Sequence, residues 1–563
     1  MSTETPLAAA AATITNPAPV GIWQQLSRFR LTQATTELGI TLQSIGLMIA
    51  AFAVSRMVLF SWTKLPEEAY FSPSILGAMC LNWRSGLAIL AVSVFVWQGW
   101  SRLKWCDLDT GNSLRCFIGV IAGTLAWTFS TYEYNLYYDQ GYYLERMLLV
   151  VLWAGAMWRP VLIVPFTALV YGVVHQFDQP LACTWTDKRA LFDVLSLFVA
   201  FLGVRLWKAP SWRAMSVNEF FYLAIVLQAA NYFVPGMGKF LLGWPFVERL
   251  DNLFVASYLN GWYGFLSTEQ ALGWARLIAD WNPFLVWSSL ILELAALFCL
   301  WNRRGGMLLL ASCIGLHAMI CLTTGILFWK WVILDAALVG VLAFRNRELT
   351  EMLFAPGRRW LSVGLILAAP LYFDSHWLAW YDTELNECYH LEAVTTSGKT
   401  FHIPRTFLTP YEVYFAQNKF HFMSDEKFVN GRYGTTVSWE ATRRLDGRPS
   451  AAVANEVRKE LGKVEFHDRK IAAFDRFVQR YFQNLNRRGV QHVVPEILQP
   501  PQHIYSVVPE PRYTGQEPVV MVRVIHERSL YQRDRIETLK REVLREIRID
   551  TAATPLVALN LSP

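Results

Sequence analysis

Three ionisable residues lie in or beside apolar stretches and are the first candidates for chemistry: Lys239, Glu293 and His317. Ionisable side chains are costly inside lipid, so each is either functional or one half of a buried pair. Lys239 follows Gly236 and Gly238, which permit a helix break and a close backbone approach. A lysine at a partly dry break can lose its proton and act as a base. An interfacial lysine that extends to water would have no such role.

Glu293 falls near the middle of the apolar stretch 281–301, and His317 near the middle of the next one, 306–326. A carboxylate and an imidazole at similar depth on consecutive helices could share a proton or bind a polar ligand. The alternative is a structural hydrogen bond between two helices. The sequence leaves both interpretations open.

Other charges in apolar stretches are Arg56, Asp193 and Asp335, and their roles stay open. Lys330 and Asp335 are five residues apart, which is a poor spacing for an ion pair along one helix.

The composition indicates that these residues belong to a membrane protein. Of 563 residues, 53% are hydrophobic and only 17% are charged, which is too apolar for a soluble chain of this length. The 24 tryptophans fit a protein with two membrane interfaces. The net charge of +6 comes from cations in short loops rather than from one basic stripe, which excludes a nucleic-acid partner.

The apolar residues form eleven segments. They lie at about 39–61, 86–101, 114–131, 143–157, 161–175, 190–206, 217–236, 281–301, 306–326, 328–344 and 360–373. We therefore predict an α-helical polytopic membrane bundle of about nine to eleven hydrophobic segments over residues 39–373. That range allows one or two segments to be re-entrant or interfacial.

Loop cations predict the orientation. With the tail 1–38 in the cytoplasm, the loop Tyr132–Gln140, which lacks Lys and Arg, lies outside. If 143–157 and 161–175 are separate passes, the positive-inside rule is obeyed at nearly every turn. The cations then inside are Arg102, Lys104, Arg115, Arg159, Arg205, Lys208, Arg213, Arg303, Arg304, Arg345, Arg347, Arg358 and Arg359. The last segment then delivers Asp374 onward to the outside.

Residues 374–563 have the composition of a soluble α+β domain, which this topology makes extracytoplasmic. An alternating run at 389–394 and a second one at 400–403 flank Ser397-Gly398-Lys399 and predict a hairpin. Apolar residues at helical spacing over 471–485 predict an amphipathic helix, and 519–525 reads as a buried strand. Prolines between them predict an extended connector.

Several classes of site have no support. The chain has no CxxC, HExxH, P-loop or GxGxxG motif, so neither a metal nor a nucleotide is implied. Of the eight cysteines, Cys80, Cys183 and Cys388 lie at or near the predicted outer face, where a disulfide could persist.

The region of Lys239 resembles a known family, the vitamin K-dependent γ-glutamyl carboxylases and the wider bacterial group that shares their membrane module, often called the HTTM domain. The stretch Tyr232–Phe240 (YFVPGMGKF) resembles the family's Tyr-Phe-x-Ala-Gly-x-x-Lys-Leu stretch, with Lys239 at the base position. Leu290–Ala295 resembles its acidic membrane segment, and His317–Phe328 its histidine-containing helix. The hairpin, helix and strand of the C-terminal domain occur in the family's order.

The resemblance implies a function. In that family a lysine deprotonates a reduced quinone, oxygen adds, and the resulting base removes a proton from a peptide glutamate, which captures carbon dioxide. It therefore implies Lys239, Glu293 and His317 as catalytic residues, a vitamin K-like reduced quinone as cofactor and a peptide substrate at the outer edge of a bacterial inner membrane. It also implies a bridge between an early outer loop and the outer domain, here Cys80 to Cys388, with Cys183 as the competing partner.

One departure separates this chain from the carboxylases. They have a second catalytic histidine in an Asn-His-x-Tyr-Leu stretch, and the best match here, Gln140–Leu144 (QGYYL), contains none. This favours a relative that keeps the architecture and has changed or lost the reaction. The alternative function is a non-catalytic membrane subunit or maturation factor that holds a partner protein.

Overall fold

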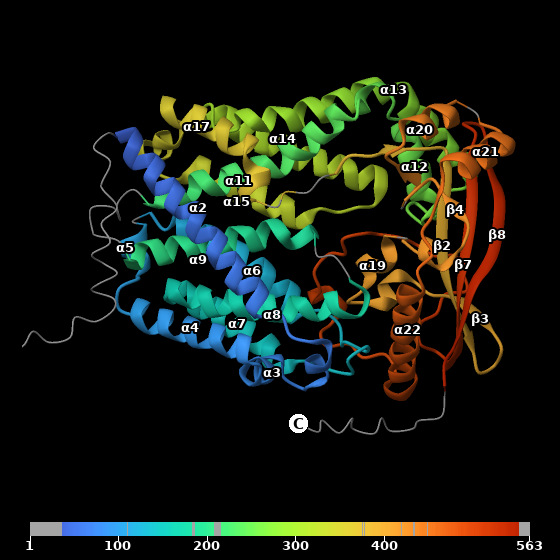
Figure 1. Cartoon of the computed structure of the whole chain (residues 1–563), viewed down its shortest axis with the longest axis horizontal. Coiled ribbons are helices and arrows are strands. Elements are labelled where there is room, and N and C mark those ends of the chain that lie inside the picture. The colour runs from blue at the N-terminus through green and yellow to red at the C-terminus, as the bar shows by residue number, and fades with distance from the viewer. Residues whose placement is uncertain are drawn as a thin grey trace, which may run out of the picture.

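The chain forms a helical bundle followed by a strand-containing C-terminal part (Figure 1). The computed structural model describes residues 37–550, except 110, 183–185, 208–215, 374, 376–377, 418, 432–433 and 448. Several residues named above therefore lie outside the described residues: most of the predicted tail 1–38, the loop cations Lys208 and Arg213, Asp374 and Cys183.

Each of the eleven predicted segments contains a helix. The helices are α2 (Glu37–Trp62), α4 (Trp83–Gly99), α6 (Ser113–Ser130), α7 (Tyr143–Trp158), α8 (Ile163–Leu181), α9 (Arg189–Trp207), α11 (Ser216–Leu241), α13 (Thr268–Ala295), α14 (Arg303–Thr324), α15 (Trp329–Phe344) and α17 (Pro356–Leu367). The ambiguous pair 143–157 and 161–175 forms two helices, joined by a 3-10 turn that starts at Pro160. Proline suits the first position of such a turn, because its missing N–H has no partner there.

Fewer of these helices qualify as spans. Within the described residues, seven are long and apolar enough to cross a membrane, or eight if the bent pair α3 (Ile75–Leu81) and α4 is one span. The two members of that pair meet at 100°. The helices α7 and α15 have 16 residues each and α17 has 12, which is short of the roughly 20 residues that a bilayer requires. The count of nine to eleven is thus correct for helices but too high for full-length apolar spans.

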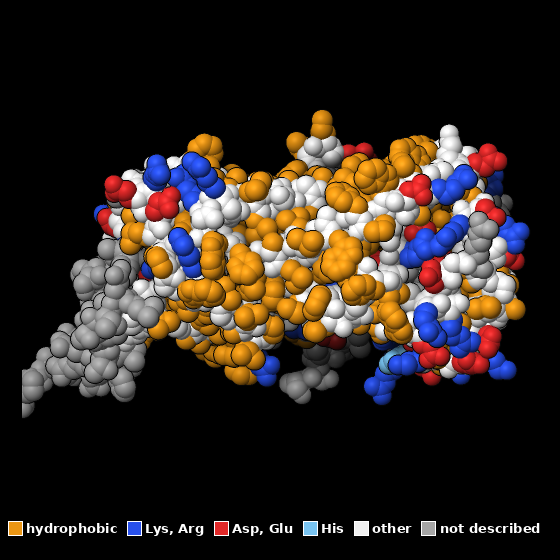
Figure 2. All heavy atoms as spheres, turned by 90° about the horizontal axis from the view of Figure 1, so that it is seen from above, with side chains coloured by type: hydrophobic (Ala, Val, Ile, Leu, Met, Phe, Trp, Pro, Cys, Tyr) orange, Lys and Arg blue, Asp and Glu red, His pale blue; other side chains and the backbone are white. Residues whose placement is uncertain are grey.

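The surface of the bundle separates by polarity. Figure 2 shows hydrophobic side chains around its middle, with Lys, Arg, Asp and Glu gathered towards the two ends. Exposed tryptophans such as Trp97, Trp158 and Trp281 belong to this apolar surface. A soluble protein rarely exposes so much contiguous apolar area, so the distribution fits a membrane protein.

The two ends of the bundle differ in what they contact. The loops 131–142, 242–267 and 325–328 contact the C-terminal part, and we call this the docking end. The loops 100–112 and 345–355 lie at the opposite end with the first turn of α11, and we call this the far end (Figure 1). The docking end carries the short helix α12 (Leu250–Leu259), and the far end carries α5 (Trp105–Leu108) and α16 (Arg347–Glu351).

A four-stranded antiparallel sheet forms the C-terminal part, with strand order β3-β2-β7-β8. The strands are β2 (Leu385–Thr395), β3 (Thr400–His402), β7 (Val519–Tyr531) and β8 (Ile536–Arg548). The predicted hairpin is β2–β3, and the predicted strand 519–525 is the first half of β7. Short pairs β1 (Tyr381–Asp382) with β5 (Thr435–Thr436), and β4 (Lys427–Phe428) with β6 (Lys463–Val464), lie beside it.

Helix α22 (Asp468–Arg488) confirms the predicted amphipathic helix. Its apolar positions Phe474, Phe477, Val478, Tyr481 and Leu485 are all buried. Its C-terminal turn carries Arg487 and Arg488, which favour the negative end of the helix dipole. The helices α19 (Glu412–Ala416), α20 (Trp439–Leu445) and α21 (Ala451–Leu461) complete this part.

The proline-rich connector between α22 and β7 runs along the docking end. The backbone N–H of Val507 donates to Gly261 O at 2.8 Å, that of Tyr505 donates to Gly325 O at 2.9 Å, and that of Leu327 donates to His503 O at 2.8 Å. These bonds use N–H and C=O groups that the loops between helices would otherwise leave unpaired. The connector therefore joins the two parts by main-chain hydrogen bonds.

Candidate functional site

Lys239 and Glu293 form a buried ion pair at the docking end. Lys239 lies in the last turn of α11, and its Nζ donates to Glu293 Oε1 on α13 at 2.7 Å. The two side chains are 18% and 9% exposed. The Lys239 ammonium also lies 5.0 Å from the ring centroid of Trp244. Both the carboxylate and the ring favour the charged amine.

Glycine is needed beside this pair because the helices are very close. A Cβ atom added at Gly236 would lie 2.8 Å from the Cβ of Glu293, which is a steric clash. The predicted helix break at Gly236 and Gly238 is wrong, since α11 continues through Pro235 to Leu241. The predicted close approach is present, and it is what brings α11 against α13.

A second polar cluster lies on the same helix. The Tyr232 hydroxyl donates to Asp335 Oδ2 at 2.5 Å and lies 2.8 Å from His317 Nε2. Gln228 Nε2 donates to Asp335 Oδ1 at 2.8 Å. Tyr232, His317 and Asp335 are at most 5% exposed.

When Asp335 is ionised, the available donors determine the direction of the hydrogen bonds in this cluster. The single hydroxyl proton of Tyr232 goes to Asp335, so Nε2 of His317 must donate to the Tyr232 oxygen. The Nδ1 of His317 is buried and has no hydrogen-bond partner, and in the neutral imidazole it is an acceptor. That nitrogen can take up a proton or accept a hydrogen bond from a ligand.

The two clusters share helix α11 but have separate partners. Tyr232 and Lys239 are seven residues apart and so lie on one face of the helix. Glu293 is hydrogen-bonded to Lys239, and His317 is hydrogen-bonded to Tyr232. Glu293 and His317 therefore do not share a proton directly. Each cluster combines groups that exchange protons readily.

The other charges in apolar stretches also have partners. Arg56 Nε lies 3.0 Å from Asp193 Oδ1. Lys330 Nζ donates to Asp187 Oδ2 at 2.7 Å, so the prediction that Lys330 and Asp335 do not pair is confirmed. Burial opposes ionisation of Asp187, but Lys188 and Lys330 together hold its pKa below the usual range.

Two buried carboxyl groups lie next to the Lys239 pair. Glu248 precedes α12, and its Oε2 accepts from the backbone N–H of Asp382 in β1 at 3.2 Å. Burial and the neighbouring Asp382 carboxyl raise the pKa of Glu248 well above its usual value, while Lys239 opposes this shift. The first strand of the C-terminal part therefore packs beside the site.

A cavity of about 780 Å³ opens between the bundle and the C-terminal part. Its lining includes Lys188, Lys330, Glu412, His492 and His503. Burial raises the pKa of Glu412 and lowers that of His503 to about 4. Lys239, Glu293 and His317 do not line this cavity.

One aromatic ring lies between the cavity and His317. The ring of His503, which lines the cavity, has its centroid 5.1 Å from that of Phe328. The Phe328 centroid is in turn 5.1 Å from that of His317. Phe328 therefore packs against both His503 at the cavity and His317 in the Tyr232 cluster.

The predicted disulfide is not formed. Cys80 is an exposed free thiol at the end of α3. Cys388 is a buried free thiol in β2, where it accepts a hydrogen bond from Asn260 at 3.5 Å. The burial of one sulfur against the bundle and the exposure of the other explain why they do not pair.

The stretch that lacks the second histidine has a structural role. The Tyr142 hydroxyl donates to the backbone O of Tyr70. Glu145, three residues later, accepts from Ser74 Oγ at 2.7 Å and from Leu76 N at 2.9 Å. These bonds fasten α7 to α3.

Sequence reasoning missed the partners of the predicted residues. In the sequence, Tyr232 is only part of a motif and Asp335 only a charge without an assigned role. Their contact could not be predicted because it joins residues 103 positions apart. Within the described residues, no group of three or more His, Cys, Asp or Glu side chains could hold a metal ion. Comparison with protein families, curated proteins and solved structures found no match for this chain.

Proposed function

We propose that this protein is an integral membrane protein of the bacterial inner membrane, with the docking end and the C-terminal part outside the cytoplasm. The loop cations support this orientation, because positive loops remain on the cytoplasmic side. Arg102, Arg205 and Arg345 gather at the far end, whereas the loop 132–140 at the docking end has only Glu133 and Asp139. The apolar surface between the two ends would contact lipid.

The proposed activity is proton abstraction at the outer membrane edge, in a carboxylase-like enzyme that modifies a peptide. One observation carries this proposal: five proton-exchanging side chains from four helices converge along one face of α11 beneath the docked C-terminal part. They are Lys239, Glu293, Tyr232, His317 and Asp335. Burying so many ionisable groups in a helical bundle is costly unless they have a function.

The residues fit a hydroxyl-bearing quinol as cofactor. The unpartnered Nδ1 of His317 can accept a hydrogen bond from a quinol hydroxyl, and Lys239 can stabilise the anion that remains after deprotonation. A reduced quinone would supply the reducing equivalents. Because Lys239 Nζ already donates to Glu293, we assign the initial proton acceptance to the unpartnered His317 Nδ1 rather than to Lys239.

The peptide substrate would enter through the cavity between the two parts. Its walls come from both the bundle and the C-terminal part, and its volume of about 780 Å³ is in the range of ligand sites.

A second candidate function is the non-catalytic subunit that holds a partner protein. The observation in its favour is that Lys239 is already paired with Glu293, as in a structural ion pair. No histidine occupies the QGYYL stretch, which has structural hydrogen bonds instead. A partner would then occupy the exposed face of the C-terminal part.

The test uses a matched pair of double variants in detergent-purified full-length protein. Lys239→Met/Glu293→Gln removes the ion pair at the docking end of α11. Arg358→Met/Glu219→Gln removes a buried ion pair of 3.4 Å at the far end of the same helix. We expect binding of reduced menadione, followed by tryptophan fluorescence, in the wild type and the far-end variant only. Equal binding by both double variants, or stoichiometric co-purification with another protein and no quinol binding, would reject the enzyme and favour the scaffold.

A further inference from the structure

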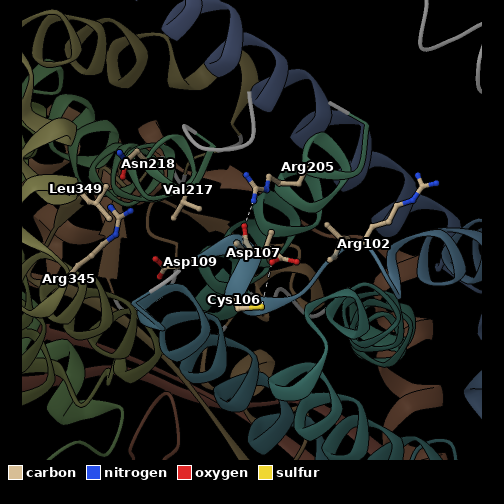
Figure 3. A pocket seen from close by; sticks show the side chains of 11 residues that line it. Arg102, Cys106, Asp107, Asp109, Arg205, Val217, Asn218, Arg345 and Leu349 are labelled. Atoms are coloured by element: carbon tan, nitrogen blue, oxygen red, sulfur yellow. Dashed lines mark hydrogen bonds between the residues drawn. The ribbon is translucent and has the colours of Figure 1, made fainter. Parts of the chain in front are cut away.

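A cavity of about 490 Å³ lies at the far end of the bundle, remote from the candidate site (Figure 3). Three arginines line it: Arg102 after α4, Arg205 near the end of α9 and Arg345 after α15. Figure 3 shows that they come from different elements, with Arg205 and Arg345 towards the cavity and Arg102 extending away at its rim.

Arg345 is a buried cation that forms no ion pair with any of the described residues. The residue is 4% exposed, and its Nε and Nη1 have no hydrogen-bond partner. The guanidinium lies 4.9 Å from the ring centroid of Phe221, and the Asp109 carboxylate also acts on it electrostatically. Beside it, Asn218 is also 4% exposed and its Oδ1 has no partner. Guanidinium groups remain charged at all physiological pH values, so burial without an anion is costly.

The Asp109 carboxylate attracts the guanidinium of Arg345, but neither aspartate of the cavity bonds to its Nε or Nη1. Asp109 accepts from Leu114 N at 2.8 Å and from Gly111 N at 3.4 Å, so both of its oxygens are used by the chain around the start of α6. Asp107 is exposed, and its backbone carbonyl accepts from Arg205 Nη2. Three arginines and two aspartates leave the lining with one net positive charge.

We propose that this cavity binds a phosphate group, with Arg345 as the main ligand and Arg205 beside it. Guanidinium N–H groups are strong donors to phosphate oxygens, and those of Nε and Nη1 have no other partner here. The phosphate is that of an anionic phospholipid headgroup or free inorganic phosphate. Basic pockets between helices at a membrane surface are known to hold lipid headgroups.

A neighbouring groove favours the lipid as the source. The groove has about 640 Å³ and is lined by Val92, Ser93, Val96, Trp97, Trp100, Ser101 and Pro165. Ser101 in the groove directly precedes Arg102 in the cavity lining. An acyl chain could lie in this apolar groove while its headgroup reaches the arginines.

The experiment measures binding to full-length protein by native mass spectrometry and by thermal stability in detergent. The probes are phosphatidylglycerol, phosphatidylcholine and inorganic phosphate at constant ionic strength. The main variant is Arg345→Met. The matched control is Arg84→Gln, which removes an exposed arginine that lies outside the cavity lining. Leu349→Trp fills the cavity without changing its charge, and it decides the question if Arg345→Met does not fold.

We expect phosphatidylglycerol to bind the wild type and the Arg84→Gln protein at least about tenfold more tightly than the Arg345→Met and Leu349→Trp proteins. Phosphatidylcholine should bind none of them preferentially. Stabilisation by inorganic phosphate alone, lost in the same variants, would assign the site to free phosphate rather than to lipid. Binding that is absent from the wild type, or equal in the wild type and both cavity variants, would overturn the proposal.

Discussion

The two ends of the helical bundle differ in which buried polar atoms have no hydrogen-bond partner. At the docking end the unpartnered buried atoms include the carboxylate oxygens Glu248 Oε1, Glu293 Oε2 and Glu412 Oε2. At the far end they include guanidinium nitrogens of Arg345 and Arg358. The docking end therefore has spare carboxylate acceptors, whereas the far end has spare guanidinium donors beside the acceptors Asn218 Oδ1 and Glu219 Oε2. Apolar side chains at both ends would be sufficient for stability alone. We therefore interpret the unpartnered polar atoms at the two ends as parts of two different ligand sites.

The largest expected effect tests which end faces the cytoplasm. If the docking end is outside, protease added to sealed right-side-out spheroplasts should remove the C-terminal part completely, while loops at the far end stay intact. Immunoblots against tags at residue 563 and in the loop 345–355 would follow the two ends. Cleavage of the far-end tag alone would reverse the orientation and with it the proposed outer-edge site.

The second effect concerns the ion pair beneath the docking part. Lys239→Ala leaves the buried Glu293 carboxylate without its cation, and we expect the free energy of unfolding to fall by about 3–5 kcal/mol. The double variant Lys239→Met/Glu293→Gln should lose much less, because no unpaired charge remains. Chemical denaturation of the single and double variants measures the difference. A silent Lys239→Ala would mean that the lysine extends to water and that the pair contributes nothing.

Close helix packing at the docking end predicts a third effect. Gly236→Ala places a methyl group 2.8 Å from Glu293 Cβ, so α11 and α13 must separate. Overpacking of this kind costs about 1–3 kcal/mol. Gly315→Ala on α14 is the control, because an added Cβ atom there meets nothing within 4 Å. Thermal shifts of the two variants should differ clearly, and equal shifts would show that the helices tolerate separation.

The helices and the chain positions of the site residues could be predicted, whereas their partners could not. Hydropathy located all eleven helices, because each one is bounded by charged or turn residues such as Arg159-Pro160. It overestimated the spans, since α7 and α15 are as apolar as their neighbours but shorter, and α17 is both shorter and less apolar. Lys239, Glu293 and His317 stood out as isolated charges. Which of them would pair depends on contacts between helices that are distant in sequence, and no local pattern reports those.

A fourth prediction uses pH to test the buried carboxyl groups of the C-terminal part. Glu384, between β1 and β2, is 3% exposed, and burial raises its pKa from 4.5 to about 8. A carboxyl group whose pKa is raised by folding contributes stability below its unfolded pKa and loses it as the pH rises through the folded value. Thermal stability of the wild type should therefore fall between about pH 5 and about pH 9, and Glu384→Gln should flatten this fall.

The control for the pH effect is Glu460→Gln, which changes an exposed carboxylate paired with Arg444 on α20. Its pH profile should follow that of the wild type. Identical profiles for the wild type, Glu384→Gln and Glu460→Gln would show that the buried carboxyl groups of the C-terminal part do not govern its stability.

The smallest effect concerns the exposed contact that joins α22 to the docking end. Asp139 accepts from Arg487 and from Arg488, and these arginines are 53% and 44% exposed. Exposed ion pairs contribute only about 0–1 kcal/mol and are screened by salt, so Asp139→Asn should destabilise the docking only slightly and only at low ionic strength. Limited proteolysis of the connector 491–511 at low and high salt measures this. The main-chain hydrogen bonds of Tyr505 and Val507 should still hold the connector in place. If Asp139→Asn instead releases the C-terminal part at every salt concentration, its charges rather than the connector join the two parts, and the docking end is held electrostatically.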